Sequence, residues 1–78
     1  MDADLAIDLS GLNCPLPILR TKKALATLQG GQTVHVVCTD PATLKDFEAF
    51  CKQTGNTLLQ GAEIDGKFIF LIQKRQQA

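Results

Sequence analysis

The chain has 78 residues, of which 45% are apolar, so it has room for one domain around one hydrophobic core. Eight Lys and Arg residues balance eight Asp and Glu residues, and the basic excess of a dedicated nucleic-acid binder is therefore missing. We expect a single domain over residues 1–78 that makes no direct contact with nucleic acid.

The cysteines and the apolar runs indicate where the protein works. The first residues, Met1-Asp2-Ala3-Asp4, are acidic where a signal peptide is basic, and no apolar segment approaches the ~20 residues of a membrane span. Cys14, Cys38 and Cys51 form no CxxC pair, and the chain has one histidine. This pattern excludes a disulfide framework and disfavours a zinc site. We expect a cytoplasmic protein with free thiols, no metal site and no membrane contact.

The first half of the chain predicts a strand, a turn and a helix. Leu5–Leu9 alternates large apolar side chains with small or polar ones, as a half-buried strand does. In the turn that follows, Gly11 is expected to adopt a backbone angle that other residues resist. Ile18–Leu28 predicts an amphipathic helix, ended by Gly30-Gly31. Its buried side is expected to comprise Ile18, Thr21, Ala24, Leu25 and Leu28.

Four residues of this region are candidates for partner docking. Leu16 and Leu19 fall outside the buried side of the helix, close to Cys14. They either pack on the neighbouring loop or form an apolar docking patch beside the thiol. Arg20 and Lys23 are also outside the buried side, and together with Lys22 they either face solvent or meet an acidic partner surface.

A second strand and a second helix follow. Thr33–Thr39 alternates, with three apolar residues on one face and His35 exposed on the other. Asp40 is expected to be the N-cap of the helix, with Pro41 at its first position and Gly55 at its end. The alternative N-cap is Thr43, which forms a capping-box-like pair with Asp46. The inward stripe of this helix is expected to comprise Leu44, Phe47, Phe50 and Cys51, with Cys38 and Cys51 acting as small buried hydrophobes.

The last part of the chain predicts a hairpin. Thr57–Ile64 is a weaker strand pattern, and Asp65-Gly66 after it is the strongest hairpin signal in the chain. Lys67–Gln73 contains five consecutive apolar residues, and a strand that is apolar on both faces belongs in the middle of a sheet. The tail, Lys74–Ala78, is polar and expected to fray.

The order β-α-β-α-β-β predicts a two-layer α/β (α+β) sandwich. Right-handed crossovers put both helices on one face of the sheet, and the hairpin makes the fourth strand antiparallel to the third. With the fourth strand between the second and third, the mixed four-stranded sheet has the order 1-2-4-3. The second face is left uncovered, and the apolar residues expected to be partly exposed there are Val37, Leu59, Ile69 and Leu71.

The segment Gly11–Pro17 places one thiol, that of Cys14, where the first strand gives way to the first helix. We expect Pro15 to be the first helical residue, so that the helix N-terminus stabilises the thiolate. Both prolines after the cysteine lack an N–H, which leaves the backbone amides of Leu16 and Ile18 to face the sulfur. We therefore predict a thiol pKa only mildly below the free value of about 8.5.

The sequence argues against two common uses of a reactive cysteine. A disulfide oxidoreductase needs a nearby resolving cysteine, and position 17 holds proline. Hydrolytic catalysis needs a histidine base, and His35 is expected on a strand face without a link to Cys14. Exchange at sulfur remains: Cys14 takes the terminal sulfur of a donor persulfide and presents it to an acceptor cysteine, without a cofactor.

The motif Asp8-Leu9-x-Gly11-Leu12-x-Cys14-Pro15-x-Pro17 resembles the signature of the TusA/SirA family of small sulfur-transfer proteins. Asp40-Pro41-Ala42-Thr43, with Asp46 and Gly55, is similar to the second block of that family. The likeness covers essentially the whole chain. It implies a β-α-β-α-β-β fold like that of the C-terminal domain of a bacterial translation initiation factor, with Cys14 as the persulfide-forming residue.

The resemblance also implies a function and partners. Such sulfurtransferases receive sulfur from a cysteine desulfurase or a rhodanese-like donor and pass it to relay proteins, in tRNA thiolation or in bacterial sulfur oxidation. The alternative is a non-catalytic interaction or regulatory module in which Cys14–Pro17 only caps a helix. The open sheet face or the leucines at 16 and 19 would then bind a partner. We expect a monomer, with a weak dimer as the alternative.

Overall fold

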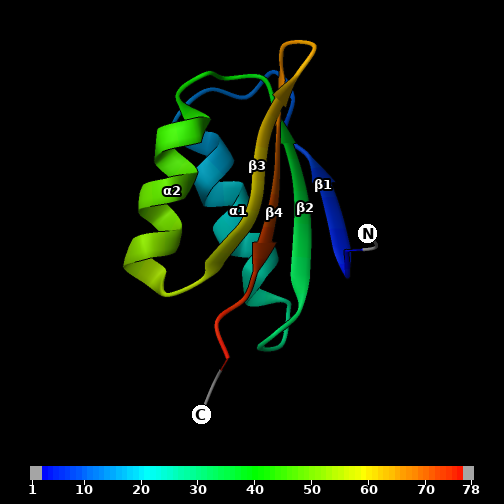
Figure 1. Cartoon of the computed structure of the whole chain (residues 1–78), viewed down its shortest axis with the longest axis vertical. Coiled ribbons are helices and arrows are strands. Elements are labelled where there is room, and N and C mark those ends of the chain that lie inside the picture. Colours follow the sequence, from blue (N-terminus) through cyan, green and yellow to red (C-terminus); the bar gives the residue numbers. More distant parts are fainter. Residues whose placement is uncertain (1–2, 77–78) are drawn as a thin grey trace.

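The computed structural model describes residues 3–76, which form two helices and four strands (Figure 1). The elements are β1 (Leu5–Asp8), α1 (Leu16–Ala26), β2 (Thr33–Cys38), α2 (Thr43–Thr54), β3 (Thr57–Ile64) and β4 (Lys67–Gln73). Both helices lie on one face of the sheet, as the sequence predicts, and complete a two-layer α+β sandwich. In residues 3–76 there is no helix with the length and apolar character needed to cross a membrane.

The strands form one mixed sheet in the order β1-β2-β4-β3, which confirms the predicted order. β1 is parallel to β2, and β4 is antiparallel to both of its neighbours. β4 takes the central place because it is apolar on both faces. Phe68, Phe70 and Ile72 point into the core, and Ile69 and Leu71 alternate with them on the opposite face. β1 and β3 are the edge strands.

The core lies between the helices and the sheet, and an aromatic contact from α2 to β4 is at its centre. The ring centroids of Phe47 and Phe70 are 4.6 Å apart, and both side chains are fully buried. Cys38 and Cys51 belong to this core, as predicted, and burial raises the pKa of each thiol to about 11. Both thiols therefore serve in packing.

Helix α1 is displaced from its predicted position. It runs over Leu16–Ala26 instead of Ile18–Leu28. The amides of the next two residues donate to carbonyl oxygens three residues back, so the chain leaves the α-helix in a tighter 3₁₀-type turn. The buried residues of α1 are Pro17, Thr21 and Leu25, whereas Ile18, Ala24 and Leu28, expected on the buried side, are half-buried.

The predicted N-cap of the second helix is wrong. α2 begins at Thr43 with Ala42 as its N-cap, and Asp40 lies in a turn before the helix. The Asp40 carbonyl oxygen accepts the N–H of Thr43 at 3.0 Å and its hydroxyl at 2.6 Å. Asp40 Oδ1 accepts the Ala42 N–H at 3.0 Å. Because Asp40 folds the chain back in this way, the helix starts three residues after it.

The buried stripe of α2 comprises Thr43, Phe47 and Cys51, spaced four residues apart. Leu44, which we expected in this stripe, lies one position further round the helix and is 40% exposed. Phe50 is half-buried and packs against the core, so the predicted stripe is correct at three of its four positions.

Two turns are formed by residues in the left-handed region, as predicted. Gly55 ends α2 with φ +80°, and its N–H donates to the Cys51 carbonyl oxygen. Asp65 and Gly66 have φ values of +52° and +79° and form the hairpin turn between β3 and β4.

The uncovered face of the sheet is less open than predicted. Val37 and Ile69 are half-buried and Leu59 is 42% exposed, but Leu71 is only 5% exposed. Leu71 is the cross-strand partner of His35 on the same face, and such neighbours shield each other. His35, which we expected to be exposed, is accordingly half-buried.

The chain after β4 is tied to the rest of the molecule, so the fraying predicted for it is wrong at Lys74 and Arg75. The Lys74 N–H donates to the Gln32 carbonyl oxygen at 2.8 Å, and the Arg75 N–H donates to Asn56 Oδ1 at 2.8 Å. Residues 77–78 lie outside the described residues.

Candidate functional site

The loop between β1 and α1 carries Cys14 and is anchored to the C-terminal end of β2. Three hydrogen bonds anchor it: Leu9 N–H to the Val37 carbonyl oxygen (2.7 Å), Gly11 N–H to Thr39 Oγ1 (2.8 Å) and Cys14 N–H to Asp40 Oδ2 (2.9 Å). The thiol is therefore mounted on a backbone that the sheet holds in place.

Gly11 gives this loop its shape. Its φ is +83°, and a Cβ added there would meet no atom within 4 Å. The glycine is therefore needed for its backbone conformation, as predicted, and not for space. Ser10 reinforces the turn, since its N–H and hydroxyl donate to Asp8 Oδ1 at 3.0 and 2.6 Å. These hydrogen bonds lower the pKa of Asp8.

Cys14 is exposed and lies just before the N-cap of α1. Pro15 occupies the N-cap, so the prediction that it is the first helical residue is wrong by one position. The shift has a local cause, because the Leu16 N–H donates to the Asn13 carbonyl oxygen at 2.9 Å and closes a turn before the helix. The peptide bond between Cys14 and Pro15 is cis.

Only part of the predicted anion-binding backbone is free. The Leu16 N–H is directed to Asn13, so our expectation that it stabilises the sulfur is wrong. Pro17 is buried and has no N–H. The Leu19 N–H donates to the Pro15 carbonyl oxygen at 3.1 Å. Within residues 3–76, Ile18 is left as the first-turn residue whose N–H has no backbone acceptor.

Two carboxylates determine the electrostatics around the thiol. A side-chain hydrogen bond with Asp46 is the largest cause that raises the pKa of Cys14 above its ordinary value. Desolvation and the negative charges of Asp46 and Asp40 act in the same direction. The predicted lowering of the pKa is therefore wrong. The prediction was based on the amides of α1 alone. In the structure, α2 packs beside α1 and its first turn lies near the thiol.

Asp40 holds the site together from the turn before α2. Its two carboxylate oxygens accept the N–H groups of Ala42 and Cys14, and these hydrogen bonds lower the pKa of Asp40. Asp40 therefore acts as a positioning residue for Cys14. The sequence marked it as a helix cap, and its approach to the loop depends on packing that local patterns do not reveal.

Residues 3–76 contain no group of three or more His, Cys, Asp or Glu side chains that could hold a metal ion.

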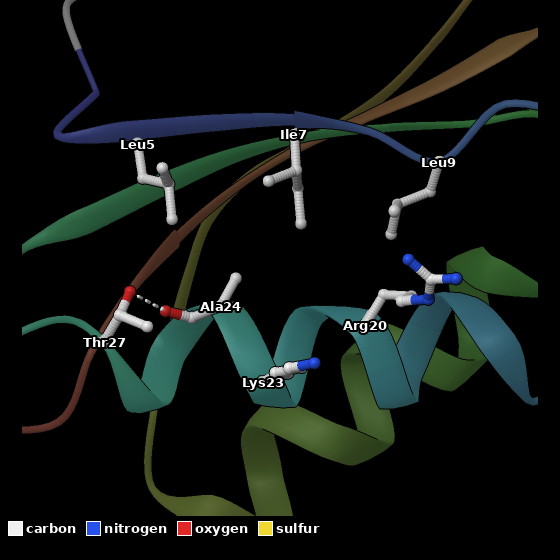
Figure 2. Close-up of a pocket in the computed structure, with 7 residues that line it drawn as sticks. All are labelled: Leu5, Ile7, Leu9, Arg20, Lys23, Ala24 and Thr27. Atoms are coloured by element: carbon white, nitrogen blue, oxygen red, sulfur yellow. Dashed lines mark hydrogen bonds between the residues drawn. The ribbon is translucent and has the colours of Figure 1, made fainter.

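The four residues predicted for docking lie on one side of α1. Leu16 and Leu19 are 43% and 54% exposed, so the neighbouring loop does not cover them. Arg20 and Lys23 are exposed as well, and their spacing continues this side of the helix away from Cys14. Arg20 and Lys23 also line a groove between α1 and β1 (Figure 2).

Known proteins are similar to this chain in sequence and in fold. The family model described as sulfurtransferase TusA matches residues 5–74. A sulfur carrier protein TusA from Allochromatium vinosum is 59% identical over 73 residues, covering 94% of this chain and 96% of the relative. A putative sulfur carrier protein from Neisseria meningitidis serogroup A is 52% identical over 69 residues, covering 88% and 93%. A crystal structure of a SirA-like protein from Desulfitobacterium hafniense matches with TM-score 0.81 and 28% identity, covering 92% of this chain and 99% of that one.

Proposed function

This chain belongs to the sulfurtransferase TusA family, and we propose that it is a sulfur carrier whose persulfide forms on the thiol of Cys14. The observation that carries the assignment is the contrast among the three cysteines. Cys14 is exposed at the start of α1, whereas Cys38 and Cys51 are buried in the core with pKa values raised to about 11. Among the three thiols, Cys14 is the one that a partner can reach.

The transfer consists of two exchange reactions at sulfur. The Cys14 thiolate attacks the terminal sulfur of a donor persulfide, the donor's S–S bond breaks, and the donor leaves as a thiolate that takes up a proton. Cys14 now holds the sulfur as its own persulfide. An acceptor cysteine thiolate then attacks the outer sulfur, and Cys14 leaves with the electron pair of the broken bond. Electrons balance in each step without an external oxidant or cofactor.

Asp46 and Asp40 disfavour loss of the thiol proton while Cys14 carries no sulfur. A raised pKa means that Cys14 rests mainly as a neutral thiol at neutral pH. Such a site keeps the reactivity of the thiol low when no partner is bound. This fits a carrier better than a strong stand-alone nucleophile.

The partners in this proposal are proteins that carry sulfur on cysteine. The donor is a cysteine desulfurase or a rhodanese-like protein, and the acceptor is a relay protein. The exposed leucines Leu16 and Leu19 provide an apolar contact beside the thiol for both. The same exchange serves tRNA thiolation and sulfur oxidation. Free thiols suit a reducing compartment such as the cytoplasm.

The assignment to Cys14 is tested by intact mass after incubation with a sulfane sulfur donor. The wild-type protein should gain the mass of one sulfur atom, about 32 Da. Cys14→Ser should not gain it, whereas Cys51→Ala, which keeps the exposed thiol, should. An adduct of equal yield on Cys14→Ser would assign the sulfur to another residue. No adduct on any of these proteins would favour the non-catalytic interaction module.

A further inference from the structure

A groove of about 430 Å³ runs between the edge strand β1 and helix α1 (Figure 2). Leu5, Ile7 and Leu9 point from the strand side toward the helix. The helix side is formed by residues three or four positions apart, namely Arg20, Lys23, Ala24 and Thr27. The groove thus has an apolar strand wall and a helix wall that carries two cations.

The groove lies where α1 packs less closely on β1 than on its main neighbours. The main neighbours of α1 are α2 and β2, whereas β1 extends the sheet beyond the helix. Leu5 and Ile7 therefore remain half-buried although they face the helix side of the sheet. A 4-residue strand with two such side chains leaves apolar surface that a further chain could cover.

The charged side chains that line the groove are both basic. All charged residues of α1 are basic, and Arg20 and Lys23 lie at the groove itself. The nearest acidic residues, Asp8 at the end of β1 and Asp4 just before the strand, are not part of the groove lining. Asp8 accepts hydrogen bonds from Ser10, and Asp4 accepts the N–H of Thr33 at 2.8 Å. Arg20 and Lys23 therefore give the lining a positive charge that an acidic ligand can meet.

β1 also offers backbone groups. It pairs with β2 on one side and lies at the end of the sheet on the other. An edge strand presents N–H and C=O groups that an extended peptide can pair with, and the alternate side chains of such a peptide enter the adjoining groove. The Leu9 end of the groove continues into the loop that carries Cys14.

We propose that this groove binds an extended segment of a sulfur-relay partner, added to the free edge of β1, with apolar side chains against Leu5 and Ile7 and carboxylates against Arg20 and Lys23. The inference rests on the proposed function and names the chemistry of the partner. A segment held there has one end beside the Cys14 loop, so it keeps the acceptor cysteine near the thiol.

A second copy of this chain is a poorer occupant than a partner. Two antiparallel β1 strands would extend one sheet, with both α1 helices on the same face and their basic sides facing each other. Like charges at close range disfavour this arrangement. Self-association through β1 is nevertheless an outcome that the experiment below detects, and it would overturn the proposal.

The test uses isotope-labelled full-length protein and NMR titration with two synthetic peptide pools. In one pool, heptapeptides carry Val, Ile or Leu and Asp or Glu in turn at positions 1, 3, 5 and 7, which share one face of an extended chain, and Ser or Thr at positions 2, 4 and 6; in the other, Lys or Arg replaces the acids. The acidic pool should give saturable shifts of the amides of residues 5–9 and 20–27. The basic pool should give none. Shifts of equal size from both pools, no shifts from the acidic pool, or concentration-dependent shifts without peptide would each overturn the proposal.

Two variants and a matched control locate the binding. Arg20→Glu combined with Lys23→Glu should weaken binding of the acidic pool roughly tenfold, since two exposed charge pairs are lost. Lys22→Glu changes the same charge on the same helix outside the groove lining and should bind like wild type. Ala24→Trp fills the groove without changing its charge and should also weaken binding. Equal affinity for the double variant and the Lys22 variant would contradict the inference.

The outcome is separable from that of the proposed function. Loading of wild-type Cys14 by a small polysulfide needs no peptide and reports on the carrier chemistry alone. Loading without groove binding would refute this inference and leave the carrier function intact. Absence of loading would refute the carrier function whatever the groove binds.

Discussion

At the scale of single residues, the thiol of Cys14 is controlled by its acidic neighbours. Asp40 holds the backbone of Cys14 through a 2.9 Å hydrogen bond, and Asp46 is the largest cause that raises the pKa of the thiol. The first interaction fixes the position of the sulfur, and the second decides how readily it loses its proton. Asp40 comes from the turn before α2, 26 residues after Cys14, and Asp46 comes from the first turn of that helix.

Removing the Asp46 charge should make Cys14 more acidic. Because Asp46 is the largest cause of the raised thiol pKa, Asp46→Asn should lower that pKa and increase the thiolate fraction at pH 7. Alkylation by iodoacetamide should then be severalfold faster, and the thiolate absorbance should develop at lower pH. Glu48→Gln, which removes one charge from an exposed position of the same helix, is the control. A higher thiol pKa in Asp46→Asn would reverse the role assigned to this carboxylate.

At the scale of elements, the parts that could be predicted are those that local chemistry determines. Asp65-Gly66 is a turn because glycine and aspartate tolerate positive φ. β4 lies inside the sheet because both of its faces are apolar. The start of α2 could not be read in this way, since Asp40 resembles an N-cap by residue type but is recruited by Cys14 and Ala42. The direction of the thiol pKa shift was also predicted wrongly, because it depends on acidic residues that are distant from Cys14 in the sequence.

The turn before α2 should make the stability of the fold depend on pH. The pKa of Asp40 is lowered in the folded protein, chiefly by the hydrogen bond from Ala42 and then by that from Cys14. Its contribution is therefore complete above the ordinary aspartate pKa of about 4 and is lost as the pH falls through the lower folded value.

Thermal unfolding of Asp40→Asn at several pH values tests this dependence. At pH 7 the variant should melt on the order of a few degrees below wild type. The gap should shrink at acidic pH, where Asp40 of the wild type is itself protonated. Asp65→Asn, in the exposed hairpin turn, should show no such convergence. A gap that stays constant down to the lowest pH would mean that the Asp40 carboxylate charge does not contribute.

At the scale of the whole molecule, two fully buried threonines join the helices to the core in different ways. The Thr43 hydroxyl donates to the Asp40 carbonyl oxygen at 2.6 Å. The Thr21 hydroxyl has no hydrogen-bond partner within residues 3–76. A buried polar group without a partner lowers stability, whereas a satisfied one is costly to remove.

Replacing each threonine by valine should therefore have opposite effects on the free energy of unfolding. Thr21→Val should raise it by up to about 1 kcal/mol, because an unpaired hydroxyl is replaced by a methyl group. Thr43→Val should lower it by about 1 kcal/mol, because a hydrogen bond is lost. Urea denaturation followed by circular dichroism measures both. Equal destabilisation by the two variants would mean that the Thr21 hydroxyl is paired, for example with a buried water molecule.

Helix α1 is fastened at both of its ends. The Cys14 N–H bonds to Asp40 before its start, and Lys74 Nζ donates to the Leu28 carbonyl oxygen at 2.6 Å just after its end. These hydrogen bonds oppose a shift of the helix onto β1, and the space between them is present in the chain by itself. Capture of a segment there then needs no opening step, and its rate is governed by diffusion and by the field of the helix cations. Added salt should slow association much more than it speeds dissociation.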